Sequence, residues 1–140
     1  MRSAECGVTE PLVTINLGGT MSHENLKDRT KAFALSIITL VDRLPETRIS
    51  RTIGGQILRA GTSVGANYRA ACRAKSRADF ISKMGTVEEE ADESLYWMEL
   101  LAEAKLVDHS SLAPLFREGS ELLAIVVTSI KTARANKSRT

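Results

Sequence analysis

The side chains of this chain whose types could do chemistry are its charged ones, and they are segregated along the sequence. Nine basic and only two acidic residues lie between positions 43 and 83, whereas seven acidic and no basic residues lie between 84 and 104. Because the formal net charge of the whole chain is only +2, this is a local separation of charge. Such a field attracts a polyanion or docks one subunit on another. It predicts binding or assembly rather than catalysis.

Most of the basic residues of interest surround one predicted connection between helices. They are Arg59, Arg69, Arg73, Lys75, Arg77 and Lys83. Arg69 and Arg73 are four residues apart and therefore share one helical face. A loop between antiparallel helices would place the five residues other than Arg59 at one end of the bundle. Arginine favours bidentate contacts to phosphate or carboxylate. We predict a nucleic acid or another anion as the partner; pairing with an acidic surface of another subunit and plain solvation are the alternatives.

The acidic run 88–93 raises the question of a carboxylate-bound metal. Two-metal carboxylate bundles use Glu from facing helices together with Glu-x-x-His motifs. The two histidines, His23 and His109, lie near predicted helix ends, and neither follows a glutamate at that spacing. We therefore predict no metal site and no cofactor. The acidic run is interpreted as a solvated face or a subunit contact.

Nucleophilic chemistry has no candidate motif in this sequence. We find no phosphate-binding glycine loop before a helix and no Cys/His pair at motif spacing, and the letters Gly-x-Ser-x-Gly at 61–65 do not stand at the strand-to-helix turn that makes a nucleophile elbow. The segment Gly61–Gly65 is glycine-rich but lies inside a helical period, where close helix packing explains the glycines. We therefore expect no enzymatic activity and no small-molecule substrate.

Apolar spacing predicts four amphipathic helices that carry these residues. The expected spans are about 22–44, 49–72, 77–106 and 110–134, with Pro45 ending the first and Pro114 in the first turn of the fourth. Short loops between such helices give an antiparallel up-down-up-down bundle. The predicted fold class is therefore all-α, a four-helix bundle.

The bundle is expected to occupy residues 23–135 as a single domain. Residues 1–22 are expected to be a disordered extension, because the strand-like stretch 12–17 would have no partner, and residues 136–140 a flexible basic tail. No apolar run approaches the roughly 18 residues that span a bilayer, and the N-terminus does not resemble a secretion signal. We expect a cytoplasmic protein without a membrane partner, in which Cys72 is a packed free thiol.

Three residues of the second and third helices receive structural roles. Asn67 falls on the apolar seam, where it would fix helix register or cap a backbone group; a ligand contact is the alternative. Trp97 and Tyr96 are adjacent and point to different sides of their helix, so one is expected in the core and the other at a subunit contact. Ser63 is the third residue to which we assign a structural role.

Three stretches of this sequence resemble a known family. They are LRAGTSVGANYRAA at 58–71, SRADF at 76–80 and EADESLYWMEL at 90–100. They are similar to the bacterial four-helix-bundle family, also called the 23S rRNA intervening-sequence protein family, over roughly residues 26–131. The motif positions are Arg59, Ser63, Asn67, Arg69, Phe80, Ser94 and Glu99, and none of them carries a catalytic role in the family.

The resemblance implies a left-handed antiparallel bundle that commonly assembles as a homopentamer. Some members are encoded within rRNA intervening sequences, and most have no established biochemical function. A related branch includes the accessory protein of diversity-generating retroelements, a basic pentameric barrel that resembles a binder of nucleic acid and reverse transcriptase. This chain departs from that branch because it is nearly neutral overall.

We therefore predict a non-enzymatic, oligomeric bundle that binds RNA, DNA or another polyanion, chiefly through Arg69, Arg73, Lys75 and Arg77. Such contacts reach mostly phosphate and carry little sequence specificity. The alternative is a structural or adaptor oligomer whose basic and acidic surfaces pair between subunits, without a nucleic-acid ligand.

Overall fold

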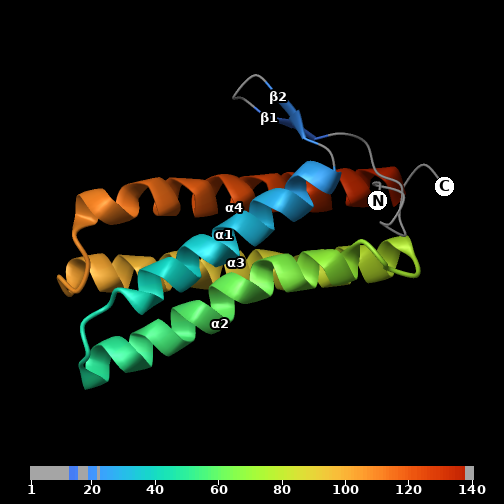
Figure 1. Ribbon diagram of the computed structural model, residues 1–140. Coiled ribbons are helices and arrows are strands. Elements are labelled where there is room, and N and C mark those ends of the chain that lie inside the picture. The colour runs from blue at the N-terminus through green and yellow to red at the C-terminus, as the bar shows by residue number, and fades with distance from the viewer. Residues whose placement is uncertain (1–12, 16–18, 22, 138–140) are drawn as a thin grey trace.

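The computed structural model describes residues 13–15, 19–21 and 23–137 and shows four long helices (Figure 1). They are α1 (His23–Asp42), α2 (Arg48–Ala71), α3 (Arg77–Glu103) and α4 (His109–Lys137). Consecutive helices run in opposite directions along the bundle (Figure 1). The predicted all-α four-helix bundle is confirmed, while its left-handed twist stays a prediction.

Part of the N-terminal segment is a short hairpin. Strands β1 (Val13–Ile15) and β2 (Gly19–Met21) pair antiparallel, with Thr14 opposite Thr20. The strand that we expected to lack a partner therefore has one, while the disordered extension stays a prediction. Residues 1–12, 16–18 and 22 lie outside the described residues. At the other end, 136–137 belong to α4 rather than to the expected tail, and 138–140 lie outside the description.

Local capping chemistry sets the helix ends around the charged segments. The Thr47 hydroxyl accepts a hydrogen bond from the Ser50 N–H (3.1 Å) at the start of α2, and the Ser76 hydroxyl accepts one from the Asp79 N–H (3.1 Å) at the start of α3. The end of α3 is closed by Lys105, whose φ of 61° is left-handed. There the Leu106 N–H reaches the Leu101 carbonyl (2.9 Å), as in a Schellman motif.

Glycines bring α1 and α2 into close contact, as the sequence predicted. A Cβ atom on Gly61 would lie 2.7 Å from Ile37 Cγ1, and one on Gly65 would lie 3.1 Å from Thr30 Oγ1. Real Cβ atoms essentially never approach as closely as the Gly61 distance, and the Gly65 distance is tighter than most real Cβ contacts, so the absence of a side chain at these positions permits this helix separation. The glycines of 61–65 are packing residues within α2.

A continuous apolar core fills the bundle. Its largest fully buried side chains include Tyr68, Phe33 and Phe80. Cys72 is also buried in this core, but it is disulfide-bonded, which corrects the expectation of a free thiol. Within the part of the chain that the structure describes, no helix combines the length and apolarity needed to cross a membrane.

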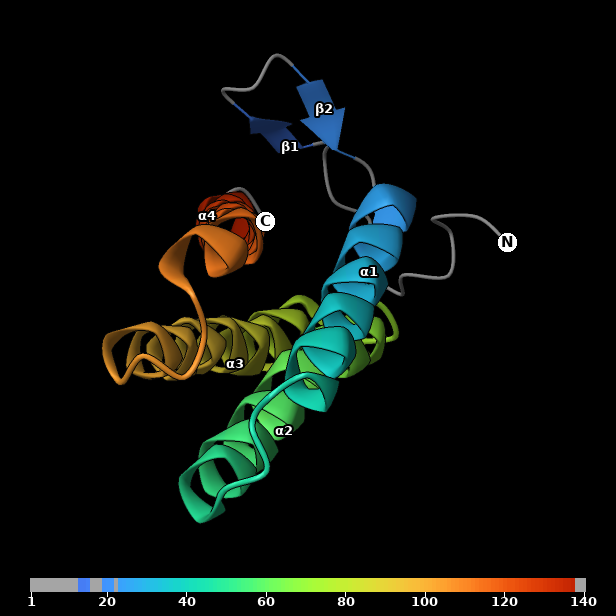
Figure 2. The ribbon, with the colours of Figure 1, turned by 60° about the vertical axis from the view of Figure 1, so that its left-hand side comes forward.

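One side of the bundle is less closed than the others. Helix α2 packs extensively on α1 and on α3, and α3 packs extensively on α4, whereas α1 and α4 meet at few positions. Figure 2 shows α1 and α4 separated over much of their length, with α3 beneath them. The core is therefore built mainly from the α1–α2–α3 layer and the α3–α4 pair.

A candidate anion-binding surface and neighbouring sites

The loop between α2 and α3 gathers basic side chains at one end of the bundle, as predicted. Arg69, Arg73 and Lys75 are exposed, and Arg77 is half-buried. No ion pair found among the described residues involves Arg69, Arg73 or Lys75. These three cations are accessible to solvent and to an anion. We call Arg69, Arg73, Lys75 and Arg77 the basic end.

Two further cations that the sequence analysis did not assign lie at this end. Helix α4 continues to Lys137, so the exposed Lys131 and Arg134 sit on its last turns. Figure 1 places the end of α4 at the same end of the bundle as the α2–α3 loop. The signal was present in the buried Ile130 and Ala133, which extend the helical period. The sequence had suggested an unstructured tail after about Arg134.

Arg59 and Lys83, the other predicted site residues, lie in different surroundings. The Arg59 guanidinium donates to Glu90 (3.2 Å) and to Glu93, bridging α2 and α3. Lys83 donates to Asp79 (2.7 Å) one turn away on α3. Because both cations already face carboxylates of their own chain, we leave them out of the basic end.

Hydrogen bonds tune two carboxylates of these pairs. The pKa of Glu93 is lowered, first by the Trp97 indole N–H (3.0 Å) and then by Arg59. The pKa of Asp79 is lowered, first by Lys83 and then by the backbone N–H of Lys75 (3.0 Å). Both side chains are thereby held as carboxylates. Their hydrogen bonds fix neighbouring side chains on the surface of the bundle.

The residues with predicted structural roles behave differently from one another. Asn67 is only half-buried and donates to the Ser63 carbonyl of its own helix (2.8 Å), while the neighbouring Tyr68 is fully buried. The prediction that Asn67 lies on the buried seam is therefore wrong by one position. The Ser63 hydroxyl donates to the Arg59 carbonyl (2.6 Å). Trp97 packs partly against the core, as expected for one aromatic of the adjacent pair.

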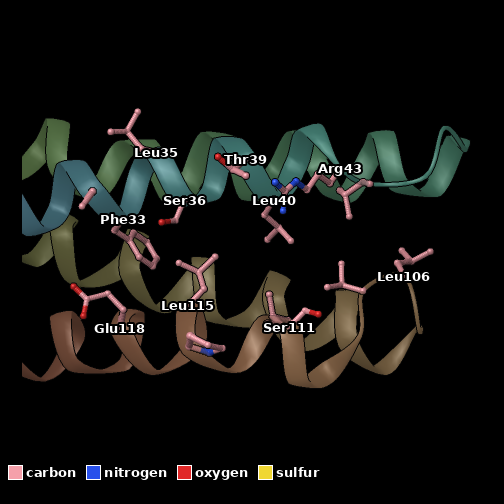
Figure 3. Close-up of a pocket in the computed structure, with 15 residues that line it drawn as sticks. Phe33, Leu35, Ser36, Thr39, Leu40, Arg43, Leu106, Ser111, Leu115 and Glu118 are labelled. Atoms are coloured by element: carbon pink, nitrogen blue, oxygen red, sulfur yellow. The ribbon is translucent and has the colours of Figure 1, made fainter.

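A groove lies between α1 and α4, with a volume of about 770 Å³. In Figure 3, Phe33 and Leu40 of α1 and Leu115 of α4 point into it, whereas Leu35 points away. Beside it, Arg29 of α1 donates to both carboxylate oxygens of Glu118 (2.6 and 2.9 Å) and to Glu121 (3.1 Å) of α4. We call this set of ion pairs the Arg29 clasp. The sequence analysis missed it, because Arg29 is 89 residues from Glu118 and 92 residues from Glu121 along the chain.

Comparison with known proteins places this architecture in a family. The model of the 23S rRNA-intervening sequence protein matches residues 24–128. This chain belongs to that family. A crystal structure of a protein with unknown function from the S23 ribosomal protein family of Bacteroides thetaiotaomicron is similar to it. The two sequences are 35% identical, the match covers 79% of this chain and 98% of the other, and the TM-score is 0.74. Comparison with curated proteins gives no match.

Membership in the 23S rRNA-intervening sequence protein family confirms the resemblance that the three sequence stretches carried. The match begins at α1 and ends within α4, so the hairpin lies outside it. The related retroelement branch and the homopentamer stay predictions. The family name describes relatives, so the biochemical role of this chain has to be inferred from its own surfaces.

Proposed function

We propose that this family member is a non-enzymatic protein that binds RNA, or a polyanion with similar phosphate spacing, through the basic end. The observation that carries the proposal is the set of exposed cations Arg69, Arg73 and Lys75, which form no ion pair among the described residues. A cation that is already paired must give up its partner to bind phosphate, whereas these three need not.

The shape of the basic end also supports this proposal. Arg69 lies in the last turn of α2, and Arg73 and Lys75 follow in the loop, so the three cations are close together in the chain at one end of the bundle. Lys131 and Arg134 of α4 add charge at the same end. A string of cations suits the regularly spaced charges of a phosphate backbone, and cations of this kind position a nucleic acid without reading its sequence.

Binding of a structured RNA by charge-reversal variants tests the proposal. Arg73→Glu should weaken RNA binding at about 50 mM salt and lower the slope of log affinity against log salt by about one, because one phosphate is no longer neutralised. Arg117→Glu is the matched control, because it makes the same charge change at an exposed position of α4 near the opposite end. Equal affinity of the wild type and Arg73→Glu at every salt concentration would contradict the proposal.

The alternative function is a structural or adaptor oligomer, for which the resemblance suggests a homopentamer. It is favoured by the exposed acidic residues of α3, which would face the basic end of a neighbouring subunit. Arg73→Glu separates the two functions. If the basic end binds RNA, the variant no longer binds RNA and keeps its oligomer mass in light scattering. If the basic end is the subunit contact, the oligomer mass of the variant falls.

A further inference from the structure

The aromatic side chains of this chain are few, and the structure accounts for each of them. The sequence contains three Phe, two Tyr and one Trp, and all six lie in helices that the structure describes. Three of them, Phe33, Tyr68 and Phe80, are fully buried in the core. Because they lie inside the bundle, they are inaccessible to the bases of a bound nucleic acid.

Two of the remaining aromatic residues lie far from the basic end. Helix α3 begins at that end, and Trp97 lies roughly 30 Å along it at about 1.5 Å per residue. Phe116 lies near the start of α4, at the opposite end of the bundle (Figure 1). Both side chains also pack partly against the core. Neither is placed to contact an RNA that is bound at the basic end.

Tyr96 is the most exposed aromatic residue, at 53%, but its surroundings are acidic. Its ring lies edge-on to Trp97, with 5.1 Å between the ring centroids. Asp92 and Glu99, four residues before it and three residues after it, are exposed on the same face of α3. Their carboxylates repel phosphate, so Tyr96 is a poor stacking partner for a base of a bound nucleic acid.

The basic end therefore offers charge without a surface on which bases can stack. None of the large hydrophobic side chains exposed among the described residues belongs to the α2–α3 loop or to the last turns of α4. Proteins that bind single strands combine cations with aromatic side chains, and each stacked base strengthens binding by roughly fivefold or more. A single strand would lose this contribution at the basic end.

We propose that the basic end binds the double-helical part of an RNA rather than a single strand. This inference rests on the proposed RNA binding and names the form of RNA that is bound. The bases of a duplex are already stacked on one another, so the protein need not supply an aromatic surface. A double helix also presents roughly twice the phosphate charge of a single strand over the same length. Where charge is the main attraction, the polymer with the higher charge density binds more tightly.

The placement of the cations also suits the two strands of a duplex. Arg69, Arg73 and Lys75 come from the end of α2 and the loop that follows it. Lys131 and Arg134 come from the last turns of α4. Figure 1 shows these two segments on different sides of the same end of the bundle. Two separate groups of cations fit the two phosphate backbones of one double helix, which proteins recognise mainly through phosphate and 2′-hydroxyl contacts.

Competition binding with the full chain tests this inference. The probes are an RNA duplex and an oligouridylate with the same total number of nucleotides, whose bases do not pair. The duplex should bind roughly tenfold more tightly at about 50 mM salt. The reason is that salt slopes of about −0.9 per contact for a double helix and about −0.7 for a single strand diverge by that factor over about four contacts between about 1 M and 50 mM salt.

Two variants show which interaction is responsible. Arg73→Glu should weaken binding of the duplex, whereas Tyr96→Ala should leave the affinity for both probes unchanged, because Tyr96 contacts neither. Circular dichroism should show that both variants keep wild-type helicity. The inference is overturned if the oligouridylate binds as tightly as the duplex, or if folded Tyr96→Ala loses affinity for the oligouridylate.

Failure of this inference is distinguishable from failure of the proposed function. If both probes bind equally and Arg73→Glu weakens both, the proposed RNA binding stands and only the preference for a duplex is wrong. If neither probe binds at low salt, the proposed RNA binding is itself wrong, and this inference is overturned with it.

Discussion

Gly61 shows how the absence of one side chain sets the separation between two helices. A Cβ there would meet Ile37 at 2.7, 3.1 and 3.2 Å, and the contacted atoms belong to the stiff β-branched part of that side chain. The helix cannot move away without opening the packing at Gly54 and Gly65. The cost of glycine in a helix is therefore offset here by the packing that it permits.

We predict that Gly61→Ala lowers the free energy of unfolding by about 1 to 3 kcal/mol through overpacking. Gly55→Ala, six residues earlier in α2, is the matched control, because nothing lies within 4 Å of the new Cβ. It should raise the free energy of unfolding by about 0.5 to 1 kcal/mol through helix propensity. Urea unfolding followed by circular dichroism measures both. If the two alanine variants shifted in the same direction, the proposed role of Gly61 in helix packing would be wrong.

Arg59 shows, also at the scale of single residues, that the neighbours of a charged side chain decide what it can bind. In sequence it belongs with the other basic residues of 43–83, and in space it belongs to Glu90 and Glu93. The partner of a charged side chain, rather than its own type, decides whether it can bind an external anion. Arg73, with no ion-pair partner among the described residues, is the informative position for that role.

At the scale of elements, α1 and α4 meet at fewer positions than the pairs α1–α2, α2–α3 and α3–α4. The Arg29 clasp is partly buried, with 20% of the Arg29 side chain exposed, and it lies beside the groove of Figure 3. Nearby, Gly119 lets α4 approach Phe33. The two helices meet through this small set of residues.

We predict that Arg29→Gln lowers the free energy of unfolding by about 1 kcal/mol, because it leaves Glu118 and Glu121 without their bidentate cation. Lys31→Gln, at an exposed position two residues later, should change it by less than about 0.5 kcal/mol. Chemical denaturation at neutral pH measures both variants. An Arg29→Gln variant as stable as wild type would mean that packing alone joins α1 to α4.

At the scale of the whole molecule, charge is distributed by the ends and faces of the bundle. The basic end lies at the end of the bundle that holds the α2–α3 loop and the end of α4 (Figure 1), and exposed acidic residues lie along α3. A nearly neutral chain can therefore carry a local basic surface of the kind that the proposed RNA binding requires. Net charge alone would not have suggested this surface.

We predict that Arg134→Glu weakens RNA binding in the same direction as Arg73→Glu, although the two residues are 61 positions apart in the sequence. The reason is that the end of α4 lies at the same end of the bundle as the α2–α3 loop (Figure 1). Filter binding at low salt measures the effect. Unchanged binding by Arg134→Glu would confine the RNA surface to the α2–α3 loop.

The sequence by itself determined the four helices, their approximate ends and the close packing of α2, because apolar period, capping residues and glycines act over a few neighbouring positions. It also brought Arg69, Arg73, Lys75 and Arg77 together, since one short loop joins their helices. Only the tertiary structure decided the carboxylate partners of Arg59 and of Arg29. It also decided the position of Arg134 at the same end as the α2–α3 loop and the groove between α1 and α4. Each depends on how distant segments pack, and the relative rotation and separation of helices are not encoded in local spacing.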